Sequence, residues 1–328
     1  MAKSPSRRAF WPHVTGGAIA MLAISRLAWA LDYPTRPVRI IVTFGAGSAS
    51  DIAARLLGQY LSERLGQPFV VENRTGAGGN IGTEAVVKSA PDGYTLLIVN
   101  PPNTINTTLY DNLNFNFLRD ITAVAMVYRQ PLVMEVNLAV PAKTVPEFVA
   151  YAKSKPGKIN IASLGIGTPQ HMAGELFKRA AGIDLVHVPY RGGPLAIADL
   201  IGGQVQVMFD VLISSIEHVR AGKLRALATT MTTRSEVLPE IPTVAESIPG
   251  YNVTSWLGVG APKGTPSEIV ERLNKEINEG LNDPKLRARF TDLGVIVSPV
   301  SPEAFGTFMA DETAKWAEVI RAANIKPE

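Results

Sequence analysis

Short β-rich runs alternate with amphipathic helical patterns along most of the 328-residue chain, and this alternation limits the fold more than any other feature. At 51–65, for example, apolar residues recur at the spacing of a one-faced helix. Strands that alternate with helices indicate βαβ units, an α/β fold and a mostly parallel sheet. We expect strands at 38–44, 68–72, 94–99, 158–163, 185–189, 205–209 and 224–229, and helices at 51–65, 81–88, 169–181, 194–201, 213–220, 266–281, 284–293 and 302–323.

The alternation starts afresh near Leu31 and again near Val145, which predicts two α/β lobes. The segments 126–140 and 248–256 have the pattern of extended crossings between the lobes. Each lobe would contain a mostly parallel sheet flanked by helices, and such proteins bind ligands in a cleft at the carboxyl ends of the strands. The prediction assigns residues 31–131 and 252–328 to lobe 1 and residues 132–251 to lobe 2.

The first thirty residues have the three parts of a cleavable export signal. Lys3, Arg7 and Arg8 form a basic segment, residues 14–25 are apolar but too few to span a membrane, and residues 28–30 (AWA) form a small-x-small cleavage site. We expect cleavage after Ala30 and a mature protein in the bacterial periplasm. The pair Arg7-Arg8 fits twin-arginine export, and an ordinary secretory signal that contains two arginines explains it equally well.

Without this signal the chain would have almost no net charge. The signal contains four of the 32 basic residues and none of the 29 acidic ones, which leaves 28 − 29 = −1. No basic stripe with interleaved aromatic residues occurs, so we expect no nucleic-acid partner. The chain has no cysteine, which excludes disulfides and thiolate metal ligands. No later apolar run is long enough to cross a bilayer, and the chain length favours two domains.

Two glycine-rich turns stand between a strand and a helix, one in each expected lobe. The first is 44–51 (FGAGSASD) and the second is 163–169 (SLGIGTP). Free N–H groups and the helix dipole make such a turn a binding site for an anion, including a carboxylate. Side-chain hydroxyls would add donors at Ser48, Ser50, Ser163 and Thr168. For either turn alone, the alternative is a compact turn with a helix N-cap and no ligand.

Catalytic patterns are weak. The sequence has no G-x-S-x-G elbow and no H-E-x-x-H pair. His171 is expected to belong to the packing or cap of a helix start, His187 to be a satisfied strand residue, and His218 to face solvent. We therefore expect no enzyme activity, no cofactor and no bound metal.

Three polar residues stand at expected cleft positions. Asp210 follows an apolar strand and should point into the cleft, either toward a ligand ammonium group or as a cap for the next helix. Tyr190 is similarly placed. Asp51 is most simply a first-turn acid stabilised by the helix dipole.

The first turn also resembles a dinucleotide-binding fingerprint. Gly45-x-Gly47-x-x-Ser50 has two of the three glycines, and Glu72 ends the next strand, where a ribose-binding acid would lie. The rival function is therefore an exported NAD(P)-dependent oxidoreductase. It would need a complete phosphate loop and a proton donor beside the nicotinamide, and neither is evident. A hydrolase is a more distant third.

Ordered segments along the whole mature chain resemble the Bug family of extracytoplasmic solute receptors, the binding proteins of tripartite tricarboxylate transporters. These segments are 33–42 (YPTRPVRIIV), 73–82 (NRTGAGGNIG), 91–96 (PDGYTL), 188–192 (VPYRG), 199–205 (DLIGGQV), 221–228 (AGKLRALA) and 261–266 (APKGTP).

The resemblance implies a two-lobed periplasmic-binding-protein (Venus-flytrap) fold that closes around a small carboxylate, gripped by backbone amides of one loop per lobe. It implies a monomer that delivers its ligand to membrane transporter subunits of the tripartite tricarboxylate type, with a signalling protein as the alternative recipient. Asp210 matches a position near the variable end of the ligand, and Asn103 and Thr104 match a pocket-lining stretch. The predicted ligand-binding residues are Phe44, Gly47, Ser48, Ala49, Ser50, Asn103, Thr104, Ser163, Gly165, Gly167, Thr168, Tyr190 and Asp210.

The first loop departs from the family pattern, which has prolines followed by adjacent glycines. Ser48 takes the second glycine position, and Thr43 and Gly45 replace prolines. Ser48 must adopt the backbone angle that the glycine used, or the loop differs. Pro101 and Pro102 are also unusual and would stiffen that wall of the pocket. The sequence does not name the carboxylate.

Overall fold

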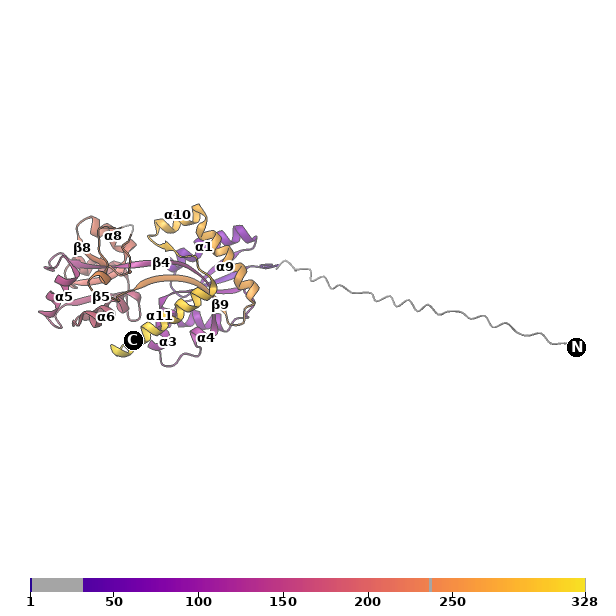
Figure 1. The fold of residues 1–328 in the computed structure, drawn as a ribbon, viewed down its shortest axis with the longest axis horizontal. Helices are drawn as coiled ribbons and strands as arrows, with labels where there is room; N and C mark the ends of the chain where they lie inside the picture. The colour runs from indigo at the N-terminus through magenta and orange to yellow at the C-terminus, as the bar shows by residue number, and fades with distance from the viewer. Residues whose placement is uncertain (2–31, 236–237, 328) are drawn as a thin grey trace. The chain divides into compact units, whose positions relative to one another are not determined.

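One long strand, β4 (Ile121–Asn137), takes part in two sheets and organises the fold. Its first part, through Pro131, pairs antiparallel with β9 (Thr254–Pro262). From Leu132 onward it pairs antiparallel with β7 (Val207–Val211) and β8 (Leu224–Thr229). In Figure 1, β4 runs between the two groups of helices that surround these sheets.

The computed structural model describes residue 1 and residues 32–235 and 238–327. The expected export signal, apart from Met1, and its cleavage site lie outside the described residues. Residues from Tyr33 onward form one compact unit. None of the helices among the described residues combines the length and the apolar character that a membrane span needs.

The first sheet has the strand order β2-β1-β3-β9-β4, and β10 pairs with β4 at its far edge. The three strands β1, β2 and β3 are parallel, so their carboxyl ends meet at one edge. β9 runs antiparallel to β3. The strands with bounds not yet given are β1 (Val38–Val42), β2 (Phe69–Asn73), β3 (Thr95–Val99) and β10 (Ile296–Val297).

The second sheet has the order β4-β7-β5-β6, and β8 pairs with β4. β5 (Asn160–Ser163) is parallel to both β6 (Val186–Pro189) and β7. Each sheet therefore joins parallel strands to an antiparallel partner, as expected for an α/β protein with mostly parallel sheets.

The helices fall close to most of the expected ranges. The two sheets are surrounded by α1 (Ala49–Leu65), α2 (Asn80–Val87), α3 (Pro101–Leu109), α4 (Phe117–Asp120), α5 (Val145–Lys153), α6 (Pro169–Ala181), α7 (Gly193–Ile201), α8 (Leu212–Arg220), α9 (Ser267–Asn282), α10 (Pro284–Asp292) and α11 (Pro302–Ala322), with short 3₁₀ turns at Ala77–Gly79 and Val244–Glu246.

Helix α3 was not expected from the sequence. Its residues, PPNTINTTL, combine two prolines with Asn and Thr, which favour turns over helix interiors. The prolines are tolerated because they occupy the first turn, where a helix needs no N–H. Tertiary burial supports the rest, because Ile105 and Leu109 pack into the hydrophobic core.

Strand β7 ends later than expected. The sequence placed its end at Phe209, but pairing with β4 continues through Asp210 to Val211. The acid therefore lies inside the strand and does not follow it. A polar residue after an apolar run predicts the end of a strand, but the hydrogen-bond ladder with β4 decides where pairing stops.

Helices α3 and α11 connect the two sheets through packing. The core cluster around the second sheet includes Ile105 and Leu109 from α3 and Trp316 and Ile320 from α11. The core of the first sheet includes Trp256 and other residues such as Ile41, Leu97, Val99, Phe305 and Met309. Helix α11 thus contributes to burial on both sides of the junction, whereas α3 contributes to the core around the second sheet.

A buried threonine fixes the place where β4 changes sheets. Thr230 Oγ1 accepts a hydrogen bond from the N–H of Leu132 (2.8 Å) and lies 2.7 Å from the carbonyl oxygen of Val253, to which it donates. Backbone hydrogen bonds join the same three residues. This clamp holds β4 beside the segment that leads into β9.

Replacing this hydroxyl should destabilise the junction. Thr230→Val keeps the shape but leaves a buried N–H and a buried carbonyl without a side-chain partner, so we expect a loss of about 1–3 kcal/mol of unfolding free energy. Urea denaturation measures it. Thr233→Val, at an exposed position, is the control and should change stability by less than about 0.5 kcal/mol. Equal stability of the two variants would show that the clamp contributes nothing.

Candidate ligand-binding site

The first glycine-rich loop carries its own acid. Ser48 is the N-cap of α1, and its Oγ accepts from the N–H of Asp51 at 3.3 Å. The N–H of Gly47, a residue with φ of 80°, donates to Asp51 Oδ2 at 2.9 Å. The first turn of the helix therefore closes back on the loop that precedes it.

Asp51 is ionised and fully engaged. Arg55 donates to both carboxylate oxygens, at 3.0 and 2.9 Å, and Asn73 Nδ2 donates to Oδ1 at 2.9 Å. Hydrogen bonds from Arg55 do most to lower the pKa of Asp51 to about 2, and those from the Gly47 N–H and Asn73 add to the effect. Asn73 also holds the carbonyl of Phe44. Asp51 is thus the structural first-turn acid that the sequence predicted.

The second loop repeats this construction 120 residues later. Thr168 is the N-cap of α6, and its Oγ1 donates to the carbonyl of Gly165 at 2.7 Å. The N–H of Gly167 donates to His171 Nδ1 at 3.3 Å, as the N–H of Gly47 donates to Asp51. Gly45, Gly47, Ser48 and Asp51 thus correspond to Gly165, Gly167, Thr168 and His171.

A neutral histidine pair supports the second loop. The rings of His171 and His187 stack with centroids 4.0 Å apart, and His187 Nε2 lies 2.6 Å from Ser163 Oγ. Burial lowers the pKa of each histidine to about 4, so both are uncharged at neutral pH. Ser163 is fully buried and also accepts from the N–H of Gly165. The hydroxyl of Ser163 therefore bonds to the loop and to the histidine pair that supports it.

Each loop leaves backbone donors unused. Within the described residues, the N–H groups of Ala49 and Ser50 at the start of α1 have no acceptor, and neither do those of Ile166 and Gln170 beside the start of α6. Ala49, Ser50 and Gln170 are among the orphan donors of a helix N-terminus, where the dipole favours negative charge, and Ile166 lies in the loop just before α6. The loops can therefore bind an anion through backbone amides, while the hydroxyls of Ser48 and Thr168 cap their helices.

Helix α3 contacts the second loop and the turn that follows β2. A Cβ atom at Gly167, whose φ is 77°, would be 2.7 Å from Leu109 Cδ2, so only glycine allows this approach. Asn106 Nδ2 donates to the carbonyl of Gly78 and to Asn80 Oδ1, both at 2.9 Å. The helix therefore joins the second loop to the turn that follows β2.

The predicted wall residues Asn103 and Thr104 lie buried in α3. Asn103 Oδ1 accepts from the N–H of Asn100 at 2.9 Å, and its Nδ2 donates to Thr83 Oγ1 at 2.8 Å. Thr104 Oγ1 donates to the carbonyl of Pro101. Their polar groups hold the start of the helix in place.

Asp210 belongs to a buried acid pair. Its side chain is 0% exposed, accepts from Gln170 Nε2 at 3.3 Å, and shares the hydroxyl of Ser215 with Glu135, which is also 0% exposed. Burial raises the pKa of Glu135 to about 8, helped by the nearby Asp210, and raises that of Asp210 to about 6. At least one of the two acids holds a proton near neutral pH.

Tyr190 is half-buried at the end of β6. Its hydroxyl donates to Asp199 Oδ2 at 2.7 Å, and burial together with this carboxylate raises the pKa of Tyr190 to about 12. The hydroxyl of Tyr190 is therefore hydrogen-bonded to a residue of α7 in this structure. Its ring packs against the cluster of apolar residues below that helix.

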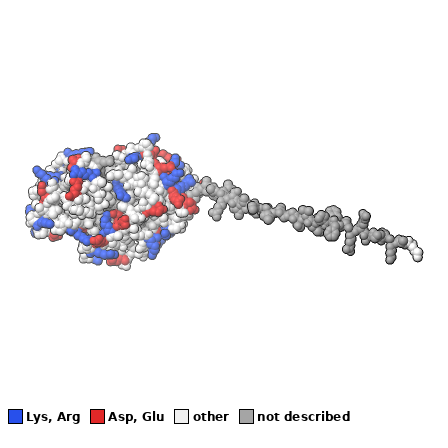
Figure 2. All heavy atoms as spheres, viewed as in Figure 1, with Lys and Arg blue, Asp and Glu red and all other residues white. Residues whose placement is uncertain are grey.

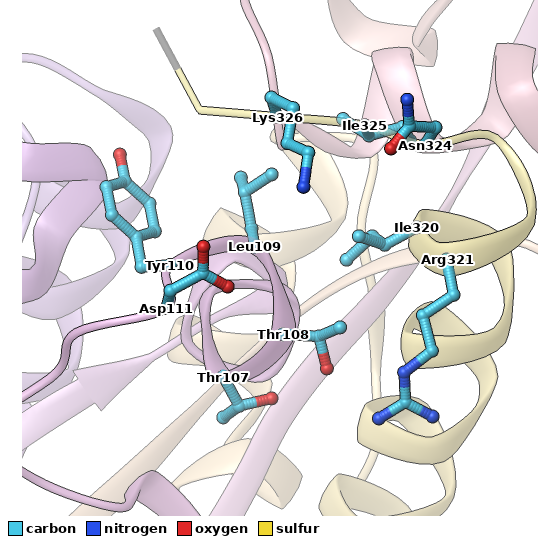
Figure 3. A pocket seen from close by; sticks show the side chains of 10 residues that line it. All are labelled: Thr107, Thr108, Leu109, Tyr110, Asp111, Ile320, Arg321, Asn324, Ile325 and Lys326. Atoms are coloured by element: carbon cyan, nitrogen blue, oxygen red, sulfur yellow. The ribbon is translucent and has the colours of Figure 1, made fainter.

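Two pockets show where space remains. One, of 300 Å³, opens between α8 and the end of α10, which flank different sheets. The other, of 470 Å³, lies between the C-terminal ends of α3 and α11, where Leu109 and Ile320 face each other (Figure 3). None of the predicted ligand-binding residues lines either pocket. Basic and acidic side chains are interspersed over the face of the molecule shown in Figure 2.

Comparison with known proteins decides the family. The family model described as the tripartite tricarboxylate transporter family receptor matches residues 53–325. Protein BugT of Bordetella pertussis is 37% identical over 316 residues, which cover 95% of this chain and 97% of BugT. The chain belongs to the tripartite tricarboxylate transporter receptor family.

Solved structures agree. The Rpa4515 protein of R. palustris, solved with adipate, superposes with a TM-score of 0.80 at 35% identity, covering 90% of this chain and 100% of that one. MatC (Rpa3494) of Rhodopseudomonas palustris, solved with bound malate, superposes with a TM-score of 0.76 at 32% identity, covering 88% and 100%. The Bug-family resemblance and the two-lobed fold predicted from the sequence are confirmed, and this protein is a periplasmic solute-binding receptor of that family.

The sequence pattern alone does not single out several buried polar residues of this receptor. Glu135 is an acid in the otherwise apolar run 132–136, and that interruption was a usable signal for a buried functional or paired carboxylate. Gln170 and Asn80 gave no such signal, because polar residues at helix starts are common. The same holds for Asn100, which stands at the start of α3.

The buried acid pair should make the receptor less stable as pH rises. In the unfolded chain Glu135 ionises near its usual pKa, whereas in the fold it stays protonated up to about pH 8, so the folded state binds more protons between about pH 4.5 and 8. Each pKa unit of difference between the folded and unfolded states corresponds to roughly 1.4 kcal/mol of unfolding free energy. Urea denaturation at pH 5 and pH 8 should show the decline. Glu135→Gln should flatten it, and Glu63→Gln, at an exposed site, should not. Identical slopes in all three proteins would contradict the assignment.

The second loop should be sensitive to the acceptor at position 171. His171→Asn offers Oδ1 to the N–H of Gly167 and cannot titrate, whereas His171→Leu leaves this buried N–H without a partner at a cost of about 1–3 kcal/mol. Because the folded pKa of His171 is depressed to about 4, stability should fall as pH drops from about 6.5 toward 4. The Asn variant should lose part of that acid sensitivity. Guanidinium denaturation at pH 7 and pH 5 tests both points. Equal stability of the Asn and Leu variants at pH 7, or an unchanged acid sensitivity of the Asn variant relative to the parent, would sink the idea.

Proposed function

We propose that this receptor captures a small carboxylate between its two lobes by hinge closure and delivers it to membrane subunits of a tripartite tricarboxylate transporter. The observation that carries the proposal is the pair of matched loops, one at the edge of each sheet, whose helix-start N–H groups have no acceptor within the described residues. Backbone donors of this kind recognise a carboxylate of any parent molecule. The adipate-bound and malate-bound relatives from R. palustris support the ligand class.

The two lobes follow from the strand that changes partners. We assign residues 31–131 and 252–328 to lobe 1 and residues 132–251 to lobe 2, because β4 leaves β9 after Pro131 and joins β7 and β8 at Leu132. The clamp at Thr230 lies at this boundary. Closure would move the loop of α6 relative to the loop of α1 about this strand.

The ligand-binding residues divide into donors and supports. In our proposal Ala49 and Ser50, with the loop backbone around Gly165 and Gly167, contact the carboxylate. Phe44, Gly47, Ser48, Ser163 and Thr168 shape the two loops, and Asn103 and Thr104 hold the wall formed by α3. Asp210 acts on the other end of the ligand, through Gln170 or after the cleft opens, and Tyr190 lies at the rim.

The proposal also covers export, processing and oligomeric state. The protein would be exported by the N-terminal signal, by the twin-arginine or the general secretory route, be cleaved after Ala30, and act as a monomer without a cofactor. Delivery to a signalling partner is the alternative to delivery to a transporter.

Two observations weigh against the exported NAD(P)-dependent oxidoreductase. The loop N–H that a phosphate would need, that of Gly47, is already bonded to Asp51. The acid expected to bind ribose, Glu72, bonds to Arg74 at 2.6 Å and lies 3.7 Å from Arg39. We therefore propose a receptor without catalytic activity.

Thermal unfolding against a ligand panel tests the proposal. Mono-, di- and tricarboxylates, acidic amino acids, aromatic acids and NAD(P) would be compared. At 100 times its dissociation constant a ligand adds about 2.7 kcal/mol, and each kcal/mol raises the midpoint by roughly 2–4 °C. We expect a shift with one class of acid. A shift with NAD(P) alone would replace the receptor by the oxidoreductase.

Three variants test the site. Ser48→Ala and Thr168→Ala should weaken binding of all acids alike, because each loosens a loop that presents backbone donors, while Asp210→Asn should change which acid is preferred. Isothermal titration measures the dissociation constants. Unchanged binding in all three variants would contradict the site.

A further inference from the structure

Four buried polar atoms of residues 43, 80 and 100, near the starts of α2 and α3, have no hydrogen-bond partner. They are Thr43 Oγ1, Asn80 Nδ2, and both Nδ2 and Oδ1 of Asn100. The three side chains are 2%, 8% and 4% exposed, so solvent does not satisfy these atoms. A buried polar atom without a partner typically costs about 1–3 kcal/mol, and a group of them needs an explanation.

These atoms belong to one edge of the first sheet. β1 and β3 are parallel neighbours, with Ile41 beside Leu97, so Thr43 and Asn100, which follow the two strands, reach the same carboxyl edge. Asn80 begins α2 next to Gly79, and a Cβ atom at Gly79 would be 3.1 Å from Thr43 Oγ1. Three elements thus bring unpartnered groups to the edge where α/β proteins bind ligands.

The polar groups around them are already paired. Asn103 bonds to the N–H of Asn100 and to Thr83 Oγ1, Thr83 Oγ1 donates to the carbonyl of Gly79, and Asn106 bonds to Asn80 Oδ1. The network therefore positions Asn80 and Asn100 rigidly and leaves the four atoms available. An arrangement that is satisfied everywhere except on one side is typical of a wall prepared for a ligand.

The chemistry of Asn100 limits what can complete this wall. Both atoms of its amide are free, so it offers a donor and an acceptor at once. A carboxylate only accepts and would leave the acceptor unsatisfied, whereas a hydroxyl both donates and accepts. The three side chains are neutral, which favours an uncharged hydroxyl over an ammonium group, because a buried cation requires a charged partner.

We propose that Thr43, Asn80 and Asn100 form a hydroxyl-recognition wall that makes this receptor selective for hydroxy-carboxylic acids over the corresponding unsubstituted acids. The inference rests on the proposed carboxylate-binding function and adds the substituent that the ligand carries. The carboxylate binds the loop amides, and the hydroxyl bonds to Asn100 and Thr43, with Asn80 Nδ2 as a further donor.

Malate and succinate test the proposal, because they differ by a single hydroxyl. Isothermal titration of the protein should show malate binding at least about tenfold more tightly than succinate, the effect expected when a buried polar group loses its partner. Asn100→Leu and Thr43→Val keep side-chain size. Thr43→Val removes only an unpartnered hydroxyl, so it should unfold no more readily than the parent without ligand. Asn100→Leu also replaces the N-cap residue of α3, so urea denaturation first checks that it is folded. Both should reduce the preference for malate, Asn100→Leu to near unity.

Thr229→Val is the matched control. Thr229 Oγ1 is equally buried and unpartnered, but it lies on β8 in the second sheet. This variant should keep the full preference for malate. Equal binding of both acids by the parent, or an unchanged preference in Asn100→Leu, would overturn the wall while leaving the carboxylate receptor intact. Binding of neither these acids nor any other member of the carboxylate panel would overturn the proposed function and the wall with it.

Discussion

The pairing of β4 is the constraint on which the rest of the structure depends. One continuous strand supplies the edge for β9 in the first sheet and for β7 and β8 in the second, so the two sheets share a covalent and hydrogen-bonded axis. Every buried N–H and carbonyl along it must find a partner, which is why Thr230 supplies a hydroxyl where the ladders change over. The two loops of the candidate site follow β1 and β5, and each of these strands is linked to β4 through the strands between them.

The candidate site is built from helix starts and leaves most side chains as support. Ser48 and Thr168 cap their helices, Asp51 and His171 fold back on the glycines, and the remaining N–H groups are left for a ligand. Backbone donors do not distinguish the parent molecule of a carboxylate, so in our proposal the choice among acids falls to buried side chains such as Asn100 and Asp210.

Much of this followed from the sequence, and the misses have physical causes. The β/α alternation, most element positions, the two loops and the family were predicted correctly, because period and turn chemistry are local properties. Helix α3 was missed because burial of Ile105 and Leu109 overrides the poor helix propensity of its Asn and Thr residues. The buried partnership of Asp210 with Glu135 joins residues 75 positions apart through the β4–β7 register, which no local pattern contains.

The two loops differ in the charge of the group that folds back on the glycine. In the first, the N–H of Gly47 donates to the carboxylate of Asp51, which Arg55 pairs; in the second, the N–H of Gly167 donates to the uncharged ring of His171. The pKa of His171 is about 4 and that of Asp51 is about 2. As pH falls, His171 would therefore be protonated before Asp51, and the N–H of Gly167 would lose its acceptor first. Acid would thus loosen the second loop while the first loop is still intact.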